Sequence, residues 1–561
     1  MENKVDDLIL DNVTDSDVDD LILNNITSGD LVFVTVTGNN FEFVADDISS
    51  SLWDSKNGVA DFFSNESRED LISLFNQLPK PFTIVQEFHY VDRCFRDTYY
   101  TYFSNQHFDV NRYSRRICFF KGCLGESDFL SLDDEMCKKI SKSFMGTCVL
   151  NPLPSGVIGR TLIDPEYLIV DNVRPVYIRL SEFTVHLYGK KLVVKAFPYR
   201  SQDGETMRCA EVTLLNLLEY FSNNFNDYKC VVPSEILDKE KMHNHERVLP
   251  SRGISYPILT KVLSDFGFSP RLYNLSSMDC FCLSKVSRAE ELKRCLHYYI
   301  ESGIPVALNL VPTGQGGPGH SIVCVGHGLV KDELKKRAQR NKWIPWDDKE
   351  KSHPIINSAD FYDEYVIVDD NQPVYQVRDF EHLSLHPDMK VENIAVPLYK
   401  RMFLDAPDAA AIVRSILHHE HLGIDAWSGN FLEPNEDVII RLFMTSSHSL
   451  KKYRFETIKH KSEREAYVLI PMPHFVWVCE LYRTCDYDAL NAFGEIVIDA
   501  TSASVEHEVK SLIMMHYPGV IGFRYPDTAS ASFEQMIEFD EDDLFLGFKN
   551  NLTEIRRGDA V

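Results

Sequence analysis

Alternating and helix-periodic apolar positions predict an α+β region between residues 31 and about 190. Alternation predicts two strands around Gly-Asn-Asn in "DLVFVTVTGNNFEFVADD", a strand at 81–92, and a hairpin at 182–198 that turns at Gly189. A helical period in "ESREDLISLFNQL" (66–78) adds a helix. We therefore expect an N-terminal α+β domain over 31–190, without a functional site of its own.

The pattern resumes after residue 395. The apolar spacing of 408–422 predicts a helix, and strands are expected in "EDVIIRLFM", "AYVLIP", "HFVWVCELY" and "GEIVIDAT". We therefore expect a C-terminal α/β domain over 396–561. At the other end, "VDDLILDNVT" recurs as "VDDLILNNIT", and two copies of so short a unit cannot build a repeat core. Residues 1–30 are expected to form an acidic arm.

The segment "SQDGETMRCAEVTLLNLLEY" (201–220) contains the first candidate for chemistry. Apolar residues with helical spacing follow the cysteine: Ala210, Leu214, Leu217, Leu218 and Phe221. With Thr206 as the expected N-cap, Cys209 lies in the first turn of a helix, where the helix N-terminus lowers the pKa of a thiol. The preceding turn lets Gln202 fold back and donate a hydrogen bond to an oxyanion. A buried structural cysteine is the competing interpretation, and this segment alone does not decide between them.

A nucleophile needs a base, and the base needs a group that orients it. In "PVALNLVPTGQGGPGHSIVCVGHG" (305–328), His320 follows a Gly-rich loop and begins a predicted strand. In "YDEYVIVDDNQPVY" (362–375), another apolar strand ends on Asp369 and Asp370, either of which could fix the tautomer of the imidazole. A strand-end histidine and a turn after a strand are ordinary features singly. Together with Cys209 they favour a catalytic site.

Three stretches, "QDGETMRCAEVTLLNLL", "GGPGHSIVCVGHG" and "YVIVDDNQP", resemble the papain-like cysteine peptidases, especially the bacterial branch similar to the bacteriocin-processing peptidases. The resemblance covers about residues 195–375. It implies an α+β fold in which a helix with the nucleophile packs on a sheet with the base, and it makes 191–395 the expected papain-like catalytic domain. It further implies Cys209 as nucleophile, His320 as base and Gln202 as oxyanion donor. It favours Asp370 as orienter, with Asp369 open because strand register easily shifts by one residue.

The chain departs from that family at several points. The Gln–Cys spacing is one residue longer than is common, and the transporter half that accompanies those peptidases is absent. A charged insertion, 331–360, separates base from orienter and contains "WIPW" (343–346). The insertion either packs on the catalytic domain, or covers the substrate cleft or docks on a partner, so that its movement gates activity. A rival pair, His474 and Asp499, repeats the strand pattern but lacks a nearby cysteine helix, so we interpret it as two buried strands with a polar pair.

Charge and composition restrict the classes of partner and the cellular location that we expect. A formal net charge of −26, from 84 acidic and 58 basic residues, argues against nucleic acid. We find no apolar run of the ~18 residues that a membrane helix needs and no secretory signal, so we expect a cytoplasmic protein without membrane contact. The thirteen cysteines lack framework or paired metal-site spacing, so neither cofactor nor metal is expected.

The sequence thus predicts an intracellular cysteine peptidase that acts on a protein or peptide, with a regulatory protein as a further candidate partner. Two alternatives stay open. One is a transglutaminase or acyltransferase that uses the same thiol, because both reactions share the acyl-enzyme. The other is a catalytically silent papain-like module that serves as an interaction scaffold.

Overall fold

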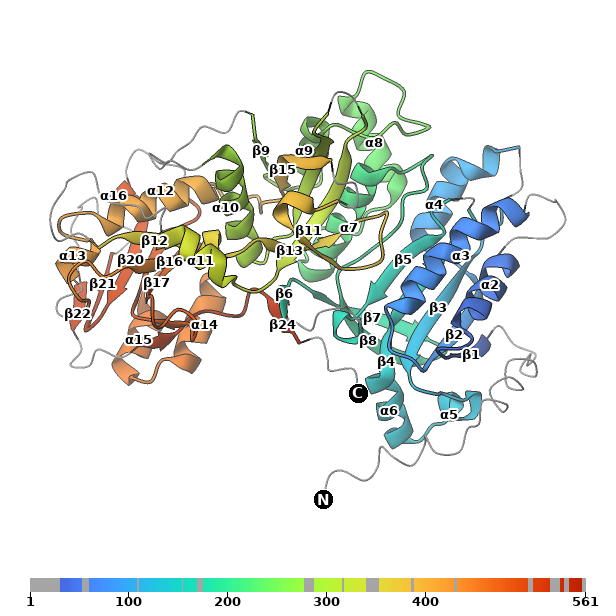
Figure 1. Cartoon of the computed structure of the whole chain (residues 1–561), viewed down its shortest axis with the longest axis horizontal. Helices are drawn as coiled ribbons and strands as arrows, with labels where there is room; N and C mark the ends of the chain where they lie inside the picture. The colour runs from blue at the N-terminus through green and yellow to red at the C-terminus, as the bar shows by residue number, and fades with distance from the viewer. Residues whose placement is uncertain are drawn as a thin grey trace.

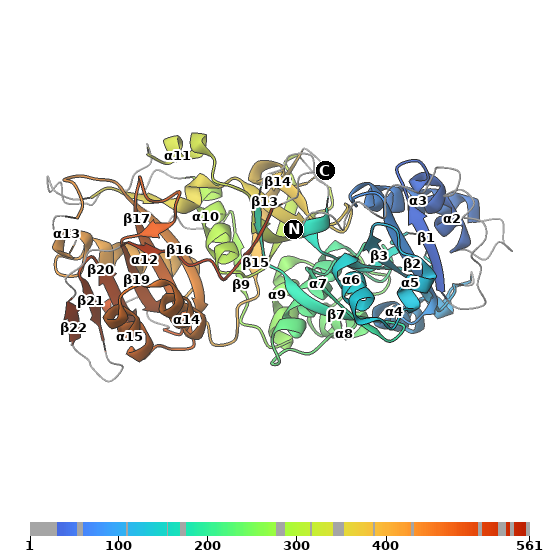
Figure 2. The ribbon, with the colours of Figure 1, turned by 90° about the horizontal axis from the view of Figure 1, so that it is seen from below.

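The computed structural model describes residues 31–556 except 53–59, 108–109, 154, 169–174, 277–286, 315–316, 340–352, 385–387, 428–430, 503–507, 525–534 and 539–543. Helices and strands are mixed throughout, which confirms the α+β class. The acidic arm and "WIPW" lie outside the described residues. Three larger β-sheets with their helices lie in a row along the longest axis (Figures 1 and 2). In the described part of the chain, no helix combines the length and apolarity needed to cross a membrane.

The first sheet is antiparallel, with strand order β1-β2-β3-β4-β5. Its strands are β1 (Leu31–Val36), β2 (Phe82–Tyr90), β3 (Ser114–Lys121), β4 (Phe144–Leu150) and β5 (Ile158–Ile163). Helices α2 (Phe41–Ser51) and α3 (Ala60–Asn76) pack on one face. The opposite face packs on α5 (Glu126–Leu130), α6 (Asp134–Ser143) and the hairpin β7 (Ser181–Leu187) and β8 (Lys190–Ala196). Helix α4 (Arg93–Thr101) follows β2.

Most predicted elements of this region are confirmed. The helix at 66–78 belongs to α3, the strand at 81–92 is β2, and the hairpin turns where Tyr188 and Gly189 take φ of 44° and 80°. The second strand after Gly-Asn-Asn is wrong, because that stretch forms α2. Val44 and Ile48 are buried at helical spacing, whereas Phe43, which completes the apparent alternation, is 60% exposed.

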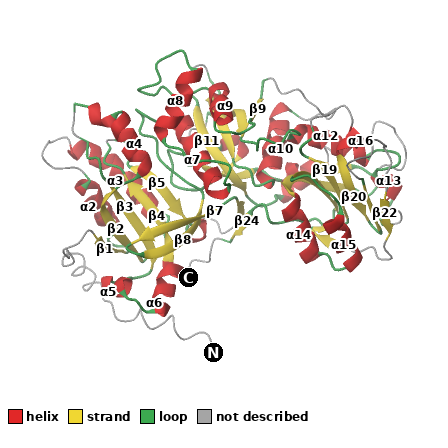
Figure 3. Cartoon of the chain, turned by 180° about the vertical axis from the view of Figure 1, so that it is seen from behind, coloured by secondary structure: helices red, strands yellow, loops and turns green. Residues whose placement is uncertain are grey.

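The central sheet has the strand order β14-β13-β11-β10-β15-β9, and β6 pairs with β11 at one side. Its strands are β6 (Val176–Ile178), β9 (Arg271–Asn274), β10 (Val306–Pro312), β11 (His320–His327), β13 (Glu364–Val368), β14 (Gln376–Asp379) and β15 (Met389–Val396). Helices α7 (Cys209–Asn224), α8 (Pro233–His243) and α9 (Tyr256–Asp265) group beside β11 (Figure 3). Helix α10 (Arg288–Glu301) packs on the other face.

The third sheet has the strand order β12-β16-β17-β19-β20-β21-β22. Its strands are β12 (Ile355–Asn357), β16 (Val438–Ser446), β17 (Phe475–Arg483), β19 (Gly494–Asp499), β20 (Leu512–Tyr517), β21 (Val520–Phe523) and β22 (Gln535–Glu538). Helix α12 (Ala406–Leu417) packs on one face, and α14 (Ser447–Thr457) and α15 (Lys461–Leu469) on the other.

The predictions for this third region are mostly confirmed. The helix expected at 408–422 is α12, and three of the four expected strands are β16, β17 and β19. "AYVLIP" is not a strand, because its first four residues end α15. Glu463, Ala466 and Tyr467 are buried at helical spacing, while Val468 and Leu469 are exposed. A short apolar run does not distinguish the two structures by its pattern alone.

Two short strands connect the central and third sheets across the expected boundary at residue 395. β12, from the expected insertion 331–360, pairs in parallel with β16, and β24 (Thr553–Ile555) pairs with β6. Helix α10 lies between the two sheets, where its Glu301 accepts a hydrogen bond from Arg441 Nη2 of β16 at 2.6 Å. The insertion also contains α11 (Asp332–Ala338). Its described ends therefore belong to the connection between the two sheets.

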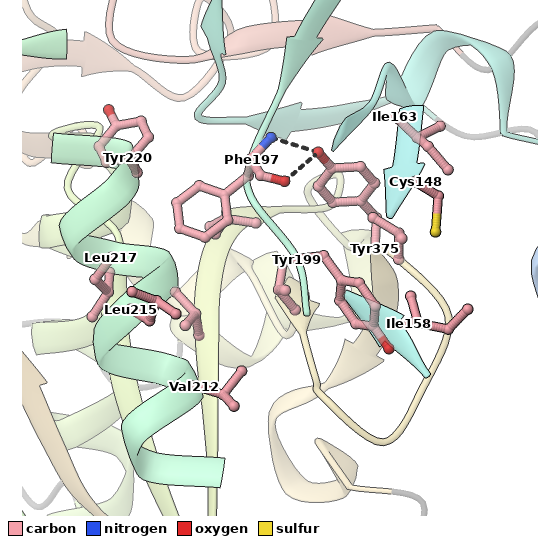
Figure 4. Close-up of a cluster of buried hydrophobic side chains, with 14 of the residues drawn as sticks. Cys148, Ile158, Ile163, Phe197, Tyr199, Val212, Leu215, Leu217, Tyr220 and Tyr375 are labelled. Carbon is pink, nitrogen blue, oxygen red and sulfur yellow. Dashed lines mark hydrogen bonds between the residues drawn. The ribbon is translucent and has the colours of Figure 1, made fainter. Parts of the chain in front are cut away.

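Helix α7 is buried on all sides, from Ala210 through Phe221. An aromatic layer separates it from the first sheet (Figure 4). In that layer the Tyr375 hydroxyl group bonds both the N–H and the C=O of Phe197, at 2.6 and 3.2 Å. Because Tyr375 follows the Asp369–Asp370 strand end and Phe197 precedes Cys209, this contact holds the two candidate segments in place.

A buried carboxyl group behind α7 makes stability depend on pH. Glu240 of α8 is 2% exposed, and its Oε2 finds no hydrogen-bond partner among the described residues. Burial, and then repulsion by Glu211 of α7, raise the pKa of Glu240 from 4.5 to about 7. Because the folded state holds this proton more tightly than the unfolded state, the resulting stabilisation is complete below pH 4.5 and is lost as pH rises through about 7.

We therefore expect Glu240→Gln to be more stable than the wild type at pH 8.5 and to unfold at a higher temperature. The gain in the free energy of unfolding should be at most about 3 kcal/mol. At pH 4.5 the difference should disappear, because Glu240 is then protonated. Thermal unfolding at both pH values measures this, with Asp238→Asn on the exposed side of α8 as control. An equal shift at both pH values would contradict the charge argument.

Candidate active site

Cys209 is the first residue of α7, and its side chain is half-buried. Its predicted place in the first helical turn is confirmed, but Thr206 is not the cap. The extended residue before the helix is Arg208, which makes no side-chain cap. Thr206 instead donates its N–H to Asp203 Oδ1 at 2.6 Å. The thiol therefore lies at a helix N-terminus whose first N–H groups have no acceptor within the helix.

Asp203 organises the loop that leads to Cys209. Its Oδ1 accepts hydrogen bonds from the N–H groups of Glu205 and Met207, both at 2.9 Å, in addition to that of Thr206. Behind this loop, Gly156 has φ of 69°, and a Cβ there would lie 2.3 Å from the Gln202 carbonyl oxygen. Only glycine fits both requirements, so the loop rests directly on the backbone of the first domain.

His320 is the first residue of β11, as predicted. The next residue fixes its place: Ser321 Oγ donates to Thr213 Oγ1 of α7 at 3.0 Å and lies 2.9 Å from the Tyr256 hydroxyl group. Thr213 stands one helical turn after Cys209, so this buried pair aligns strand and helix. The side chains of His320 and Cys209 are hydrogen-bonded to each other. The structure thus brings the predicted nucleophile and base together.

Asp369 is the closer partner of the imidazole, whereas the sequence favoured Asp370. His320 Nε2 lies 2.8 Å from Asp369 Oδ1 and 3.7 Å from Asp370 Oδ1. Both carboxylates follow the end of β13, which pairs antiparallel with β11, so they reach the strand start that His320 occupies. Because Asp369 engages Nε2, Nδ1 remains for the thiol.

A polar network that the sequence analysis missed holds Asp369. Its Oδ1 accepts the N–H of Asn371 at 3.0 Å, and its Oδ2 accepts Gln372 Nε2 at 2.8 Å. Gln372 Oε1 in turn accepts Arg378 Nη2 at 3.0 Å. The sequence did contain a signal for this network, because Asn371 and Gln372 directly follow the two aspartates. A buried carboxylate that orients a histidine needs hydrogen-bond donors of its own. The network fixes one carboxylate toward the ring.

The charges and burial of His320, Asp369 and Asp370 favour an imidazolium on His320 paired with a carboxylate on Asp369. Burial opposes protonation of His320, but hydrogen bonds to Asp369 and Cys209 outweigh it and raise the pKa of His320 to about 10. Burial likewise opposes ionisation of Asp369, but the hydrogen bond from His320 lowers the pKa of that carboxyl group. For Asp370, burial and the neighbouring Asp369 carboxylate raise the pKa to about 7. The imidazolium form of His320, paired with the Asp369 carboxylate, is therefore favoured.

Gln202 lies at the site without touching the thiol. Its Nε2 donates to Asn371 Oδ1 at 2.8 Å, and no described contact joins it to Cys209. Gln202 lines a cavity of about 540 Å³, together with Arg208 and Asp370. This bond uses one of the two N–H donors of the Gln202 amide, and the other remains for an oxyanion.

The far wall of this cavity belongs to the first domain. Glu69 and Asp70 of α3 line it together with Asp370 and Asn371, which follow β13. The sequence assigned no clear site to the region 31–190, yet its helix α3 lines this cavity. The lining includes Arg208, the neighbour of Cys209 in the chain, but neither Cys209 nor His320. The cavity is therefore shared by two parts of the chain that are far apart in sequence.

The rival pair at 473–501 does not assemble. His474 is exposed and packs on Phe475, with ring centres 4.3 Å apart. Asp499 accepts the N–H and hydroxyl group of Thr501 at 2.7 and 2.6 Å, as a turn residue does. The interpretation as two buried strands is confirmed by β17 and β19, whereas no hydrogen bond or ion pair joins His474 to Asp499 among the described residues.

Three possible metal ligands meet at the candidate base: His320, Asp369 and Asp370 offer atoms that all lie within 4.8 Å of one another. This grouping within the described residues was not expected from the spacing of the cysteines and histidines. Comparison with protein-family models and with curated protein sequences finds no match.

Proposed function

We propose that this protein is a cysteine peptidase with a papain-like catalytic core. The single observation behind the proposal is the continuous arrangement of Cys209, His320 and Asp369, in which thiol, imidazole and carboxylate follow one another at hydrogen-bonding distance. A nucleophile at a helix start, with its base and orienter on an adjacent sheet, also agrees with the resemblance in residues 195–375. Free thiols throughout the described cysteines are compatible with action in the cytoplasm.

In the proposed reaction, the Cys209 thiolate attacks the carbonyl carbon of a peptide bond and forms a tetrahedral oxyanion. His320 then gives its proton to the leaving amine, and the C–N bond breaks to leave a thioester on Cys209. A water molecule next attacks the thioester while His320 takes its proton. Collapse of the second oxyanion breaks the C–S bond and releases the acid, which leaves the Cys209 thiolate beside the protonated His320 for the next cycle. Asp369 orients the ring in both halves.

Two donors support the oxyanion in this proposal. The N–H of Cys209 lies at the free N-terminus of α7, where no helical carbonyl group accepts it. The second is the Gln202 side-chain amide, which keeps one N–H while the other is donated to Asn371. The shared cavity, which Arg208 next to Cys209 lines, would hold part of the peptide, and Glu69 and Asp70 in its lining would favour a basic side chain.

The experiment that tests the proposal is a map of alkylation rates at neutral pH by mass spectrometry. We expect half-buried Cys209 to react faster than the exposed Cys123, Cys230 and Cys485, although exposure alone predicts the opposite order. Burial raises the pKa of Cys123, which makes it a slow reference. If any of the three exposed thiols reacts faster than Cys209, the assignment fails.

A peptide library then identifies the reaction. Cleavage that is lost in Cys209→Ala and retained in Cys230→Ala supports a peptidase. If added amines are incorporated in preference to water, the enzyme is an acyltransferase or transglutaminase. Fast alkylation of Cys209 without turnover of any library member would leave only the interaction module.

A further inference from the structure

Two carboxyl groups, those of Asp369 and Asp370, lie beside His320, although one is enough to orient its imidazole. A single carboxylate suffices to hold an imidazole, and Asp369 does so with its own donors satisfied. Asp370 is 6% exposed, and neither of its carboxyl oxygens has a hydrogen-bond partner among the described residues. Its Oδ1 points to the same ring nitrogen, 3.7 Å away. A buried carboxyl group without donors is costly to ionise, which agrees with the raised pKa of Asp370, so a cation that binds here has to displace a proton.

The atoms form a triangle of the right size for a transition-metal ion. A tetrahedral zinc ion with bonds of about 2.0–2.1 Å places its ligand atoms about 3.3 Å apart. The two measured edges from His320 Nε2, 2.8 Å to Asp369 and 3.7 Å to Asp370, lie on either side of that value. Small side-chain rotations would equalise them.

The ligand types and the charge of the site also indicate a transition-metal ion. One imidazole and two carboxylates suit zinc and its neighbours, whereas magnesium and calcium require more oxygen ligands than this site offers. A divalent ion also balances the two carboxylate charges when the imidazole is neutral. Asp370 lines the 540 Å³ cavity, which gives an ion and its remaining water ligand a route from solvent.

We propose that His320 Nε2, Asp369 and Asp370 form a binding site for Zn²⁺ or a similar divalent transition-metal ion, and that the bound ion switches the catalytic site off. The ion replaces the hydrogen bond between His320 and Asp369, so the ring can no longer be held and protonated as the base of Cys209. Cys209 stays outside the metal site in this proposal, because Nδ1 is the ring nitrogen left for the thiol when Nε2 binds the ion. The metal binding stands on the geometry alone, and only the inhibition rests on the proposed peptidase activity.

Calorimetric titration of the full chain with Zn²⁺, and Co²⁺ absorption as a probe of coordination, test the site without any substrate. We expect one ion with tetrahedral Co²⁺ bands and no thiolate-to-metal charge-transfer band. Asp370→Asn should weaken binding by at least about tenfold, because a direct ligand should matter no less than outer-shell partners. The double variant His419→Ala/His421→Ala, which removes an exposed histidine pair with ring centres 6.0 Å apart, should bind as the wild type does.

Several outcomes would overturn the site. These are the absence of a bound ion, unchanged affinity in a folded Asp370→Asn variant, or loss of binding in the His419/His421 variant. A measurement on the wild type avoids dependence on variant folding: Zn²⁺ should slow the modification of His320 by diethyl pyrocarbonate, as seen by mass spectrometry. Failure of this protection would also refute the site.

The regulatory part has its own readout. With the ion bound, alkylation of Cys209 should slow at least tenfold and recover on chelation. If Zn²⁺ binds as described but Cys209 is unreactive with and without it, the metal site holds and the peptidase proposal fails. If Cys209 is reactive and the bound ion leaves its rate unchanged, the inhibition is refuted and the peptidase proposal is untouched.

Discussion

Replacing Asp369 with Asn is expected to lower the alkylation rate of Cys209 and peptide turnover by roughly 10²–10⁴-fold, the range seen when the orienting carboxylate of a catalytic triad is neutralised. The carboxylate accepts the His320 Nε2–H at 2.8 Å. An amide in its place can present N–H to the ring, which favours the wrong tautomer. It also loses the charge that stabilises the imidazolium. Stopped-flow alkylation, with the Cys209 peptide identified by mass spectrometry, measures the effect.

The matched comparison is Asp370→Asn, which removes the neighbouring carboxylate 3.7 Å from the same nitrogen. We expect it to cost less than about tenfold, because no direct hydrogen bond is lost. Asp332→Asn on the surface helix α11 serves as the neutral control. A larger loss in Asp370→Asn than in Asp369→Asn would reverse the assignment and return the orienter to the residue that the sequence favoured.

The candidate site was predictable from sequence to the extent that it is local. The helix after Cys209 and the strands around His320 and Asp369 each carry their own periodicity, and each was found. The choice between the two aspartates was not local. It depends on how β13 lies against β11, and a shift of one residue exchanges which side chain faces the ring.

The contacts that hold the site in place could not be predicted from the sequence pattern either. Ser321 and Thr213 are 108 residues apart and meet only because α7 packs on β11. Three-residue strands such as β12 and β24 carry too few positions for an alternation to be recognised, although they connect two sheets. The error at α2 has the same origin, since its apolar residues fit both periods over a short stretch and only burial decides.

Replacing Arg454 with Met should destabilise the third sheet by about 3–5 kcal/mol, the typical cost of breaking a buried ion pair from one side. Arg454 of α14 is completely buried, and its Nη2 donates to Glu480 at 2.7 Å and to Glu495 at 2.5 Å. Arg441 is the remaining cation of the group and already bonds Glu301 and Glu480. Without Arg454, one guanidinium faces three buried carboxylates.

The midpoint of urea unfolding, followed by intrinsic fluorescence, checks this, since Trp477 lies buried in the same sheet. Arg483→Met is the matched control. Arg483 pairs with Asp486 at 2.5 Å, but its side chain is 28% exposed, so its loss should cost no more than about 1 kcal/mol. Adding Glu495→Gln to Arg454→Met should recover part of the stability, because it removes one of the uncompensated charges. Equal losses for the two arginines, or no recovery in the double variant, would show that packing rather than charge balance holds α14 to the sheet.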